Sequence, residues 1–245
     1  MHSAPLKVLV VDNDPGLRRA LRASLAANGY AIDEARTGEE AVERAADRQI
    51  DLVLIDVDMP GIGGIEACRR LRTLLPQAGL VMVTVCDREE DRIRALEAGA
   101  DDYITKPFSI RELLARLRAI LRRLVGRQPE ETVVQIGELE LDTRHHMLRK
   151  AGTEIRLSPT EFSLISYLML HANVPIEHAK LLRAVWGPEY GSELEYLRTY
   201  IKRLRKKIET NATRPEYLIT IPWLGYCFST PGQTAASALL LAAAQ

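Results

Sequence analysis

Apolar and polar residues follow two different patterns along the first half of the chain. Five short, mainly apolar runs occupy residues 6–11, 30–35, 52–56, 79–85 and 101–105. Runs of this length are typical of strands, and the most apolar of them suit a parallel sheet covered on both faces. We therefore expect five strands in residues 1–124.

The segments between these runs repeat their apolar residues every three or four positions, as amphipathic helices do. In residues 15–29, Leu17, Leu21 and Leu25 fall on one face, and Gly29 ends the segment. Similar segments cover residues 39–49, 64–75, 89–99 and 109–124. Five strands that alternate with helices predict an α/β fold with a doubly wound parallel sheet, here in the flavodoxin-like order 2-1-3-4-5.

The pattern changes in the second half. Residues 125–133 are polar and include glycine and proline, which predicts a linker. Beyond it, strands are predicted at 136–142, 145–150, 153–158, 216–221 and 225–228, and helices at 158–173, 176–187 and 193–209. A small sheet, three helices and a terminal hairpin predict an α+β winged helix-turn-helix domain over residues 134–230. The apolar tail, residues 231–245, is expected to be frayed or to form a small docking helix.

The start of the first helix in this second half carries a clear signal. Ser158 suits the N-cap, Pro159 suits the first helical position, and Glu161 completes a capping box.

Polar residues gather where the predicted parallel strands end. Asp12 and Asn13 follow the first strand, Asp56 ends the third, Thr84 lies near the end of the fourth, and Lys106 follows the fifth. Because parallel strands bind ligands at their carboxyl ends, these side chains are expected to converge on one site.

The chemistry of this set suits phosphoryl transfer. Several oxygens around one cavity are ligands for a hard divalent cation such as Mg²⁺ or Mn²⁺. An aspartate beside such a metal can accept a phosphoryl group as a nucleophile. The lysine would offset charge on the phosphoryl oxygens, and Thr84 would donate a hydrogen bond to them.

The net charge of the chain does not indicate any class of binding partner, because 33 basic residues balance 33 acidic ones. The three cysteines form no Cys-x-x-Cys pair, so neither a zinc site nor a disulfide framework is indicated. No segment is apolar over a length that spans a bilayer, and no signal peptide is evident, so we expect a cytoplasmic protein without a membrane partner.

Local charge is more informative in residues 193–209. Leu197, Ile201, Leu204 and Ile208 share one helical face, which should pack on the core. Six of the ten residues 198–207 are basic and none is acidic. The polar residues expected to meet phosphates and base edges in a major groove are Arg198, Thr199, Lys202, Arg203, Arg205 and Lys206.

The stretches VLVVDND, LVLIDVDMPGIGG, VMVTV and GADDYITKPF resemble the receiver domain of two-component response regulators. This resemblance implies that Asp56 is the phosphoacceptor and that Asp12 belongs to the acidic pocket. It implies that Asp58 offers a metal ion its backbone carbonyl, that Thr84 and Tyr103 form a switch pair, and that Lys106 contacts the phosphoryl group. The Lys106–Pro107 bond is expected to be cis, as in the family.

Two positions depart from the receiver pattern. Asn13 stands where the family usually has a second, metal-binding acid, and it can ligate only through a neutral amide oxygen. Val85 replaces the small alanine common after the switch threonine, which would narrow access to Asp56.

The second half resembles the effector domain of OmpR/PhoB-type regulators in LSPTEFSLISYL, LLRAVWG, LRTYIKRLRKKIE and LITIPWLGYCF. Within that family, VWGPEY and RPEYLIT are similar to stretches of potassium-transport regulators. The wing departs from the pattern, because Pro222, Trp223 and Leu224 precede Gly225 where the family often has arginine and glycine. Thr220 could still touch a phosphate.

The family also dimerises through its last receiver elements. The resemblance implies cross-subunit pairs between Arg92 and Glu112, Asp102 and Arg116, and Asp101 and Arg118. We therefore expect a non-enzymatic, phosphorylation-controlled transcription regulator. Its partners would be a sensor histidine kinase, a second copy of the chain, double-stranded promoter DNA and RNA polymerase.

Two alternatives compete with this interpretation. A haloacid-dehalogenase-type phosphotransferase shares the Asp-x-Asp spacing, but its motif lies on the first strand of its domain, whereas Asp56 ends the third. An atypical regulator that binds DNA without phosphorylation is favoured only by Asn13.

Overall fold

The computed structural model describes residues 5–47, 49–85, 88–125 and 133–230. Its contacts divide the chain into two units, Met1–Leu124 and Val125–Gln245. Most of the predicted linker (residues 126–132) and the predicted tail (231–245) lie outside the described residues. No helix within the described ranges is long and apolar enough to cross a membrane.

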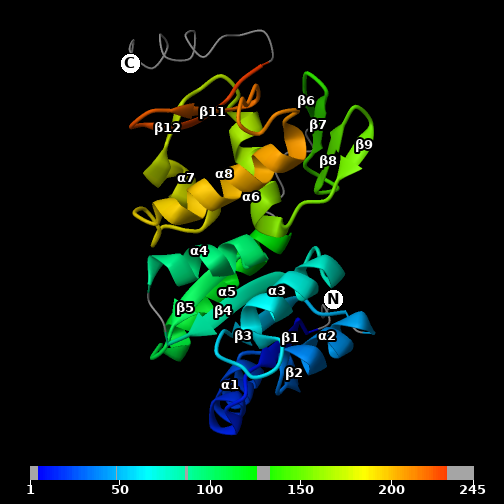
Figure 1. Ribbon diagram of the computed structural model, residues 1–245, viewed down its shortest axis with the longest axis vertical. Helices are drawn as coiled ribbons and strands as arrows, with labels where there is room; N and C mark the ends of the chain where they lie inside the picture. The colour runs from blue at the N-terminus through cyan, green and yellow to red at the C-terminus, as the bar shows by residue number, and fades with distance from the viewer. Residues whose placement is uncertain (1–4, 48, 86–87, 126–132, 231–245) are drawn as a thin grey trace. The chain divides into compact units, whose positions relative to one another are not determined.

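The first unit contains a five-stranded parallel sheet in the order β2-β1-β3-β4-β5, which confirms the predicted topology (Figure 1). The strands are β1 (Lys7–Val11), β2 (Ala31–Ala35), β3 (Leu52–Asp56), β4 (Gly79–Thr84) and β5 (Asp102–Thr105). Every residue of β3 and β4 is buried, because helices cover both faces of the sheet.

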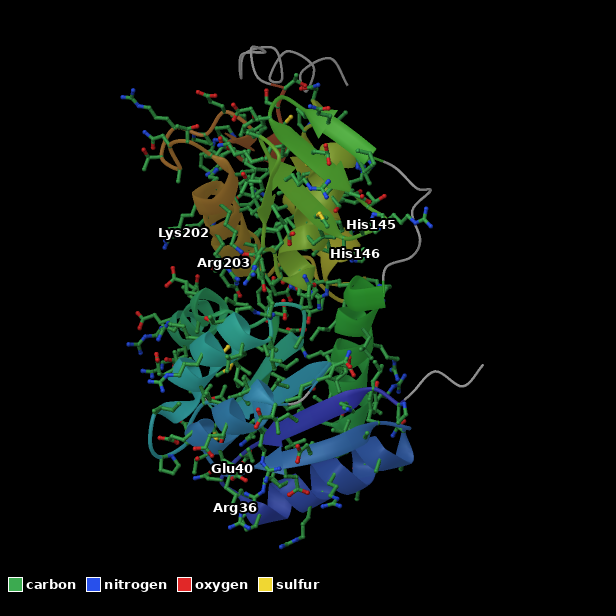
Figure 2. All side chains as sticks on the ribbon, turned by 90° about the vertical axis from the view of Figure 1, so that its right-hand side faces the viewer. Arg36, Glu40, His145, His146, Lys202 and Arg203 are labelled. Carbon is green, nitrogen blue, oxygen red and sulfur yellow. The ribbon has the colours of Figure 1, made fainter. Side chains whose placement is uncertain are left out.

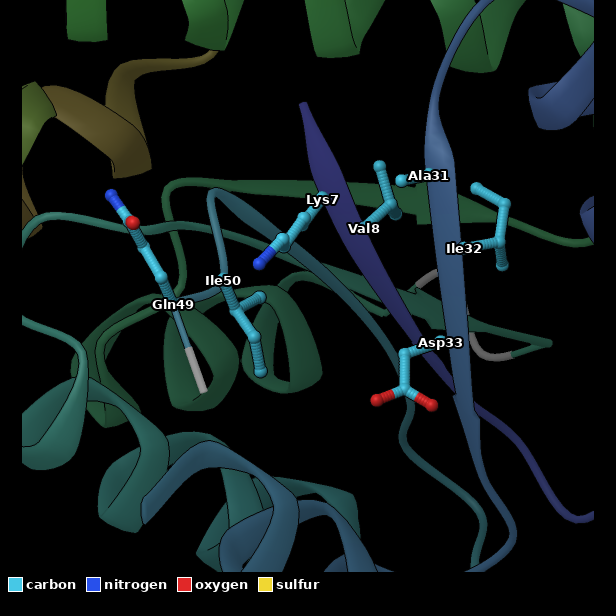
Figure 3. Close-up of a pocket in the computed structure, with 7 residues that line it drawn as sticks. All are labelled: Lys7, Val8, Ala31, Ile32, Asp33, Gln49 and Ile50. Carbon is cyan, nitrogen blue, oxygen red and sulfur yellow. The ribbon is translucent and has the colours of Figure 1, made fainter. Parts of the chain in front are cut away.

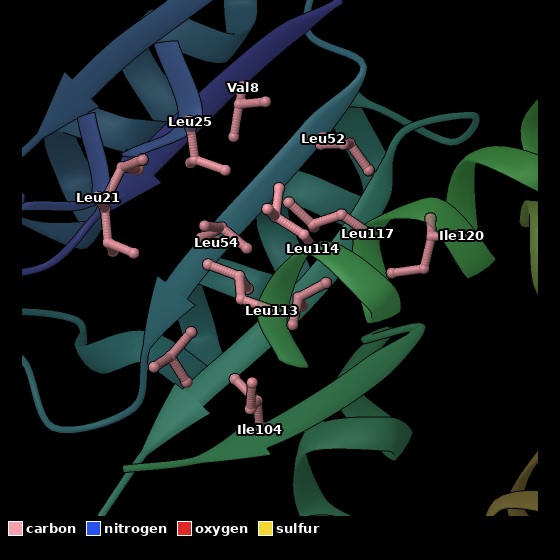
Figure 4. Close-up of a cluster of buried hydrophobic side chains, with 13 residues drawn as sticks. Val8, Leu21, Leu25, Leu52, Leu54, Ile104, Leu113, Leu114, Leu117 and Ile120 are labelled. Carbon is pink, nitrogen blue, oxygen red and sulfur yellow. The ribbon is translucent and has the colours of Figure 1, made fainter. Parts of the chain in front are cut away.

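Five helices connect and follow these strands: α1 (Pro15–Ala27), α2 (Gly38–Ala46), α3 (Gly63–Leu74), α4 (Glu89–Ala98) and α5 (Ile110–Val125). Helices α1 and α5 bury leucines on one face of the sheet, against Val8, Leu54 and Ile104 among others (Figure 4). Helices α2, α3 and α4 pack side by side on the other face. This two-sided burial leaves the strand ends as the place where polar side chains can gather.

The second unit starts with a four-stranded antiparallel sheet made of β6 (Val133–Ile136), β7 (Leu139–Asp142), β8 (Met147–Lys150) and β9 (Thr153–Ile155). The single strand expected over residues 136–142 is wrong, because the chain turns between Ile136 and Leu139. Gly137, at φ +59°, makes this turn possible.

The helices of this unit are α6 (Pro159–Leu170), α7 (His178–Val185) and α8 (Leu194–Ile208). The capping box at Ser158 and Glu161 is present as predicted. Residues 176–177 were expected to begin the second helix. They instead form β10 (Ile176–Glu177), which pairs with the closing hairpin.

That hairpin consists of β11 (Leu218–Ile221) and β12 (Gly225–Phe228), and the sheet order is β10-β12-β11 (Figure 1). Trp186 is fully buried beneath α8 and meets the rings of Tyr196 and Tyr200 edge-on at 5.7 and 5.3 Å. These contacts fix α8 on the domain core and confirm the winged helix-turn-helix.

Candidate functional site

The carboxyl ends of β1 and β3, with the residues after β5, build one polar site. Asp12 directly follows β1, Asp56 ends β3, and the parallel register aligns these ends. Both aspartates are buried, at 2% and 5% exposure. Two buried carboxylates of like charge repel each other, so the pair needs a cation.

Lys106 supplies a positive charge between them. Its Nζ lies 2.9 Å from Asp12 Oδ2 and 3.2 Å from Asp56 Oδ1. Burial lowers the pKa of Lys106, but the hydrogen bonds and charges of Asp12 and Asp56 outweigh it and raise that pKa. The lysine is therefore a stable ammonium group held at the phosphoacceptor candidate.

Asp56 experiences opposing effects. Burial and the charge of Asp12 raise the pKa of Asp56, while Lys106 and a hydrogen bond from the Asp58 backbone N–H act in the opposite direction. The net shift is upward. An additional cation would stabilise the ionised, nucleophilic form of this carboxylate.

The residues present fit a hard divalent cation. Asp12 and Asp56 offer two buried carboxylates, while Asn13 and Asp58 are exposed at the rim of the same site. Asp14 is engaged elsewhere, because its Oδ1 accepts the backbone N–H groups of Gly16 at 2.7 Å and Leu17 at 3.3 Å and caps α1. Among the described residues, no group of three or more His, Cys, Asp or Glu side chains could hold a metal ion, so the Asn13 amide and the Asp58 backbone carbonyl would have to complete the ligand set of the two carboxylates.

The first turn of α3 approaches the end of β3 closely. A Cβ added to Gly64 would lie 1.9 Å from the backbone oxygen of Asp56, so only glycine fits. Glu39, at the start of α2, accepts the backbone N–H of Ile62 at 2.8 Å. The sequence does not reveal this role of Glu39, because a carboxylate in the first turn of a helix is usually explained by the helix dipole.

Arg18 is a second residue whose role the sequence does not reveal. It is buried in α1, and its Nη1 donates to the backbone oxygen of Asp12 at 2.6 Å. Its Nε lies 3.5 Å from Glu34. This arginine holds the backbone at the end of β1 and thereby positions Asp12.

The switch candidates are both buried. Thr84 is 0% exposed and Tyr103 is 3% exposed, on adjacent strands β4 and β5. The backbone oxygen of Thr84 accepts the N–H of Lys106 at 2.6 Å, and the peptide bond from Lys106 to Pro107 is cis as predicted. The threonine therefore ends its strand beside the residue that bridges the two carboxylates.

The predicted DNA-contacting residues of α8 separate into residues that are exposed to solvent and residues that are buried or bound to other parts of the domain. Arg198, Lys202 and Lys206 are exposed and lie one turn apart along the helix (Figure 2 shows Lys202 beside Arg203). Thr199 is only 6% exposed. The exposed basic face of α8 is therefore narrower than the run of charges suggests.

Arg203 and Lys207 meet a buried carboxylate. Arg203 Nε lies 3.1 Å from Glu161 Oε1, and Lys207 Nζ lies 2.7 Å from Glu161 Oε2. Glu161 is 0% exposed and also accepts the backbone N–H of Ser158 at 2.7 Å. These two cations hold α8 against α6.

Arg205 fastens the other side of α8 to the hairpin. Its guanidinium donates to the backbone oxygen of Leu218 at 2.5 and 2.9 Å and to the Thr220 hydroxyl at 2.8 Å. Thr220 itself is exposed at the edge of β11.

Comparison with known proteins identifies both units. Residues 8–118 match the response regulator receiver domain, and residues 152–228 match the C-terminal domain of transcriptional regulatory proteins. The chain is 38% identical over 222 residues to the transcriptional regulatory protein KdpE of Mycobacterium tuberculosis, covering 90% of this chain and 98% of that protein. It is also 38% identical over 231 residues to ResD of Bacillus subtilis, covering 91% and 95%.

The chain is a response regulator of the OmpR/PhoB type. A solved structure of a RitR mutant shares the fold at a TM-score of 0.73 with 23% identity, covering 91% of this chain and 98% of that one. The response regulator is thus a phosphorylation-dependent transcription regulator rather than an enzyme, and the phosphotransferase alternative is not supported.

The predicted dimer residues of this response regulator lie on α4, on β5 or directly before it, and on α5. Asp102 Oδ1 is 3.2 Å from Arg116 Nη1 of the same chain, and Arg116 Nη2 is 3.2 Å from Glu112. Asp101 is buried and lies 2.5 Å from Arg72 Nη2. Cross-subunit pairs would require these aspartates to share or exchange their present partners.

The remaining two dimer candidates differ in exposure. Arg118 is exposed on α5, and Arg92 is half-buried on α4. The predicted cross-subunit pairs of Arg118 with Asp101 and of Arg92 with Glu112 stay predictions.

A hollow of about 240 Å³ lies at the opposite end of the receiver sheet (Figure 3). Its lining includes Lys7, Ile32 and Asp33 near the amino ends of β1 and β2. Asp33 there is paired with Arg44 at 2.7 Å. The hollow therefore lies away from the site of Asp56 and plays no part in its chemistry.

Proposed function

We propose that Asp56 of this response regulator accepts a phosphoryl group from the phosphohistidine of a sensor kinase. An Asp56 carboxylate oxygen attacks phosphorus, the bond between phosphorus and the kinase imidazole nitrogen breaks, and its electron pair returns to the imidazole. The product is an aspartyl phosphate on Asp56. The observation that supports this proposal best is the position of Lys106 Nζ between Asp12 and Asp56, at 2.9 and 3.2 Å.

Lys106 would hold charge on the incoming phosphoryl oxygens, since an ammonium group so close to the nucleophile requires no reorganisation. Thr84 would donate its hydroxyl hydrogen to one of those oxygens. Arg18, through the backbone of Asp12, would keep the acidic pocket in place.

We propose Mg²⁺ or Mn²⁺ as the metal of this site. Asp12, Asp56, the backbone carbonyl of Asp58 and the amide oxygen of Asn13 would hold it. When bound, such an ion neutralises charge on the carboxylates and the phosphoryl oxygens. Since Asn13 is neutral where the family has an acid, we expect weaker metal affinity than in a receiver with two adjacent acids.

Phosphorylation would act on the effector through a second copy of the chain. Thr84 would move toward the phosphoryl group with Tyr103 packed behind it, and this shift would favour a two-fold receiver dimer through α4, β5 and α5. Two effector domains joined in this way gain affinity for paired half-sites through effective concentration.

The effector would bind double-stranded promoter DNA with α8 in the major groove. Arg198, Lys202 and Lys206 are the exposed cations that would meet phosphates and base edges, whereas Arg203 and Arg205 would orient the helix from within the domain. We further propose a cytoplasmic location and contact with RNA polymerase, in line with control of transcription.

The relatives named KdpE and ResD are both 38% identical to this chain, so sequence identity does not indicate which of their target promoters this chain would share. Potassium-transport promoters are our first candidates because of the stretches VWGPEY and RPEYLIT.

The test is DNA affinity with and without phosphodonor. Duplexes selected from a random library by the acetyl-phosphate-treated protein would serve as probes in fluorescence anisotropy. We expect tighter binding after treatment, an unchanged affinity for Asp56→Ala, and weaker binding by Lys202→Ala in both states. Equal affinity with and without phosphodonor in the wild-type chain would favour regulation independent of phosphorylation.

A further inference from the structure

The turn between β11 and β12 presents a tryptophan entirely to solvent. Trp223 is 101% exposed, far more than Val85 at 65%, the next most exposed large apolar residue among those described. Folded proteins usually bury the large apolar surface of tryptophan. A fully exposed ring at the tip of a hairpin therefore needs an explanation.

The backbone beneath Trp223 adds a second observation. The N–H of Leu224 donates to the backbone oxygen of Ile221 at 3.2 Å, which closes a tight turn with Pro222 and Trp223 at its centre. Trp223 has φ +67°. Glycine adopts this conformation without strain, whereas a residue with a bulky side chain does not. Strained backbone of this kind concentrates at functional sites.

The hairpin is held firmly, so its tip has a defined position. Arg205 of α8 binds the Thr220 hydroxyl and the Leu218 backbone oxygen. The N–H of His178 donates to the backbone oxygen of Leu224 at 3.1 Å, and the His178 ring meets Tyr226 edge-on at 5.5 Å. Contacts from α7 and α8 thus fix the turn that carries the tryptophan.

The hairpin lies beside the exposed basic face of α8. At about 100° of rotation per residue, Arg205 falls next to Arg198 and Lys202 around the helix. Arg205 contacts β11. Burial raises the pKa of Tyr226 in β12, and the nearby charges of Arg205 and Arg198 counter part of that rise. With α8 in a major groove, a hairpin along the edge of that helix would lie next to the adjoining minor groove, because one sugar–phosphate strand separates the two grooves.

We propose that Trp223 is an apolar aromatic wedge that enters the minor groove of duplex DNA beside the site read by α8. This inference rests on the proposed DNA-binding function. Apolar side chains inserted between base steps unstack and bend the duplex. The ring would thus bind without a charged contact, and would favour sites flanked by flexible pyrimidine–purine steps.

The salt dependence of binding tests this wedge. The slope of log affinity against log salt counts phosphate contacts, so an apolar wedge contributes to affinity and not to the slope. Between about 50 and 200 mM salt, Trp223→Gly should lose about tenfold in affinity, near the low end for aromatic–base stacking, with an unchanged slope. Trp223→Phe should retain most of the affinity, while Lys202→Ala should lower the slope by about one.

Two controls separate binding from folding. Trp223→Gly removes a strained φ, so its unfolding midpoint should equal or exceed that of the wild type while its DNA affinity falls. Val174→Ala alters another exposed apolar residue of the same domain, 48% exposed, and should leave affinity unchanged. In the wild type, DNA should protect Trp223 from acrylamide quenching; Trp186, which is 0% exposed, contributes little to that quenching.

Unchanged affinity in Trp223→Gly, with Trp223 still open to acrylamide in the DNA complex, would overturn the wedge. Lost transcription with unchanged DNA affinity would also overturn it, because the ring would then serve a protein partner. Should Lys202→Ala also bind with wild-type affinity and slope, the proposed DNA-binding face itself would fail.

Discussion

Glu161 allows the most direct test of how the effector domain holds its DNA-binding helix. Glu161→Ala removes a carboxylate that is 0% exposed and meets Arg203 at 3.1 Å, Lys207 at 2.7 Å and the backbone N–H of Ser158 at 2.7 Å. Removing one partner of a buried ion pair costs about 3–5 kcal/mol, and losing a helix cap costs about 1 kcal/mol.

The expected loss lies near the lower end of that range. The side chains of Arg203 and Lys207 keep 17% and 33% of their exposure, so water can partly solvate them after the substitution. We therefore expect Glu161→Ala to lower the free energy of unfolding of the effector domain by about 3 kcal/mol, mostly because Arg203 and Lys207 lose the carboxylate that balances their charge.

Urea denaturation followed by tryptophan emission measures this quantity in one domain. Both tryptophans of the chain, Trp186 and Trp223, belong to the second unit, so the signal reports that unit alone. Glu140→Ala is the matched control, because Glu140 and Arg149 lie 2.6 Å apart with both side chains 37% exposed. That exposed pair should contribute less than about 1 kcal/mol. Equal, small losses in the two variants would refute the role assigned to Glu161.

Three further predictions concern the receiver. Because burial and the charge of Asp12 raise the pKa of Asp56, ionisation of Asp56 destabilises the receiver at pH values above that pKa. Asp56→Asn should therefore raise the melting temperature of the receiver at neutral pH, as measured by calorimetry. This gain should disappear as the pH falls through the raised pKa toward 3.8, the usual pKa of an aspartate. Lys106→Met should slow phosphorylation by acetyl phosphate about 100-fold, measured as the rate of mass gain, and a wild-type rate would remove the lysine from the mechanism. Gly64→Ala should lower the free energy of unfolding by about 3 kcal/mol, measured by urea denaturation followed by circular dichroism, because the added Cβ would meet the Asp56 backbone oxygen. Gly29→Ala is the control: no atom lies within 4 Å of its added Cβ, so it should lower that free energy by about 1 kcal/mol, through its positive φ alone.

The sequence predicts the receiver well because its strands are apolar on both faces. Runs such as Leu52–Asp56 are typical of strands at the centre of a parallel sheet, where both faces are buried. The carboxyl ends of such strands lie at the same edge of the sheet. The convergence of Asp12, Asp56 and Lys106 follows from that geometry.

Long-range pairs are harder to predict. Arg203 and Lys207 belong to a continuous basic run, and nothing in that run shows that both turn toward Glu161, more than forty residues earlier. Very short strands are hard to predict for a related reason. Strand β10 has two residues, and only its pairing with β12, about fifty residues later, makes it a strand.

Asp56 itself is tested most directly by intact mass after incubation with acetyl phosphate, with and without Mg²⁺. We predict a Mg²⁺-dependent gain of one phosphoryl group in the wild-type chain and no gain in Asp56→Ala, which would also show that Asn13 is tolerated. No gain in the wild type, under conditions that label a receiver with two adjacent acids, would contradict the account.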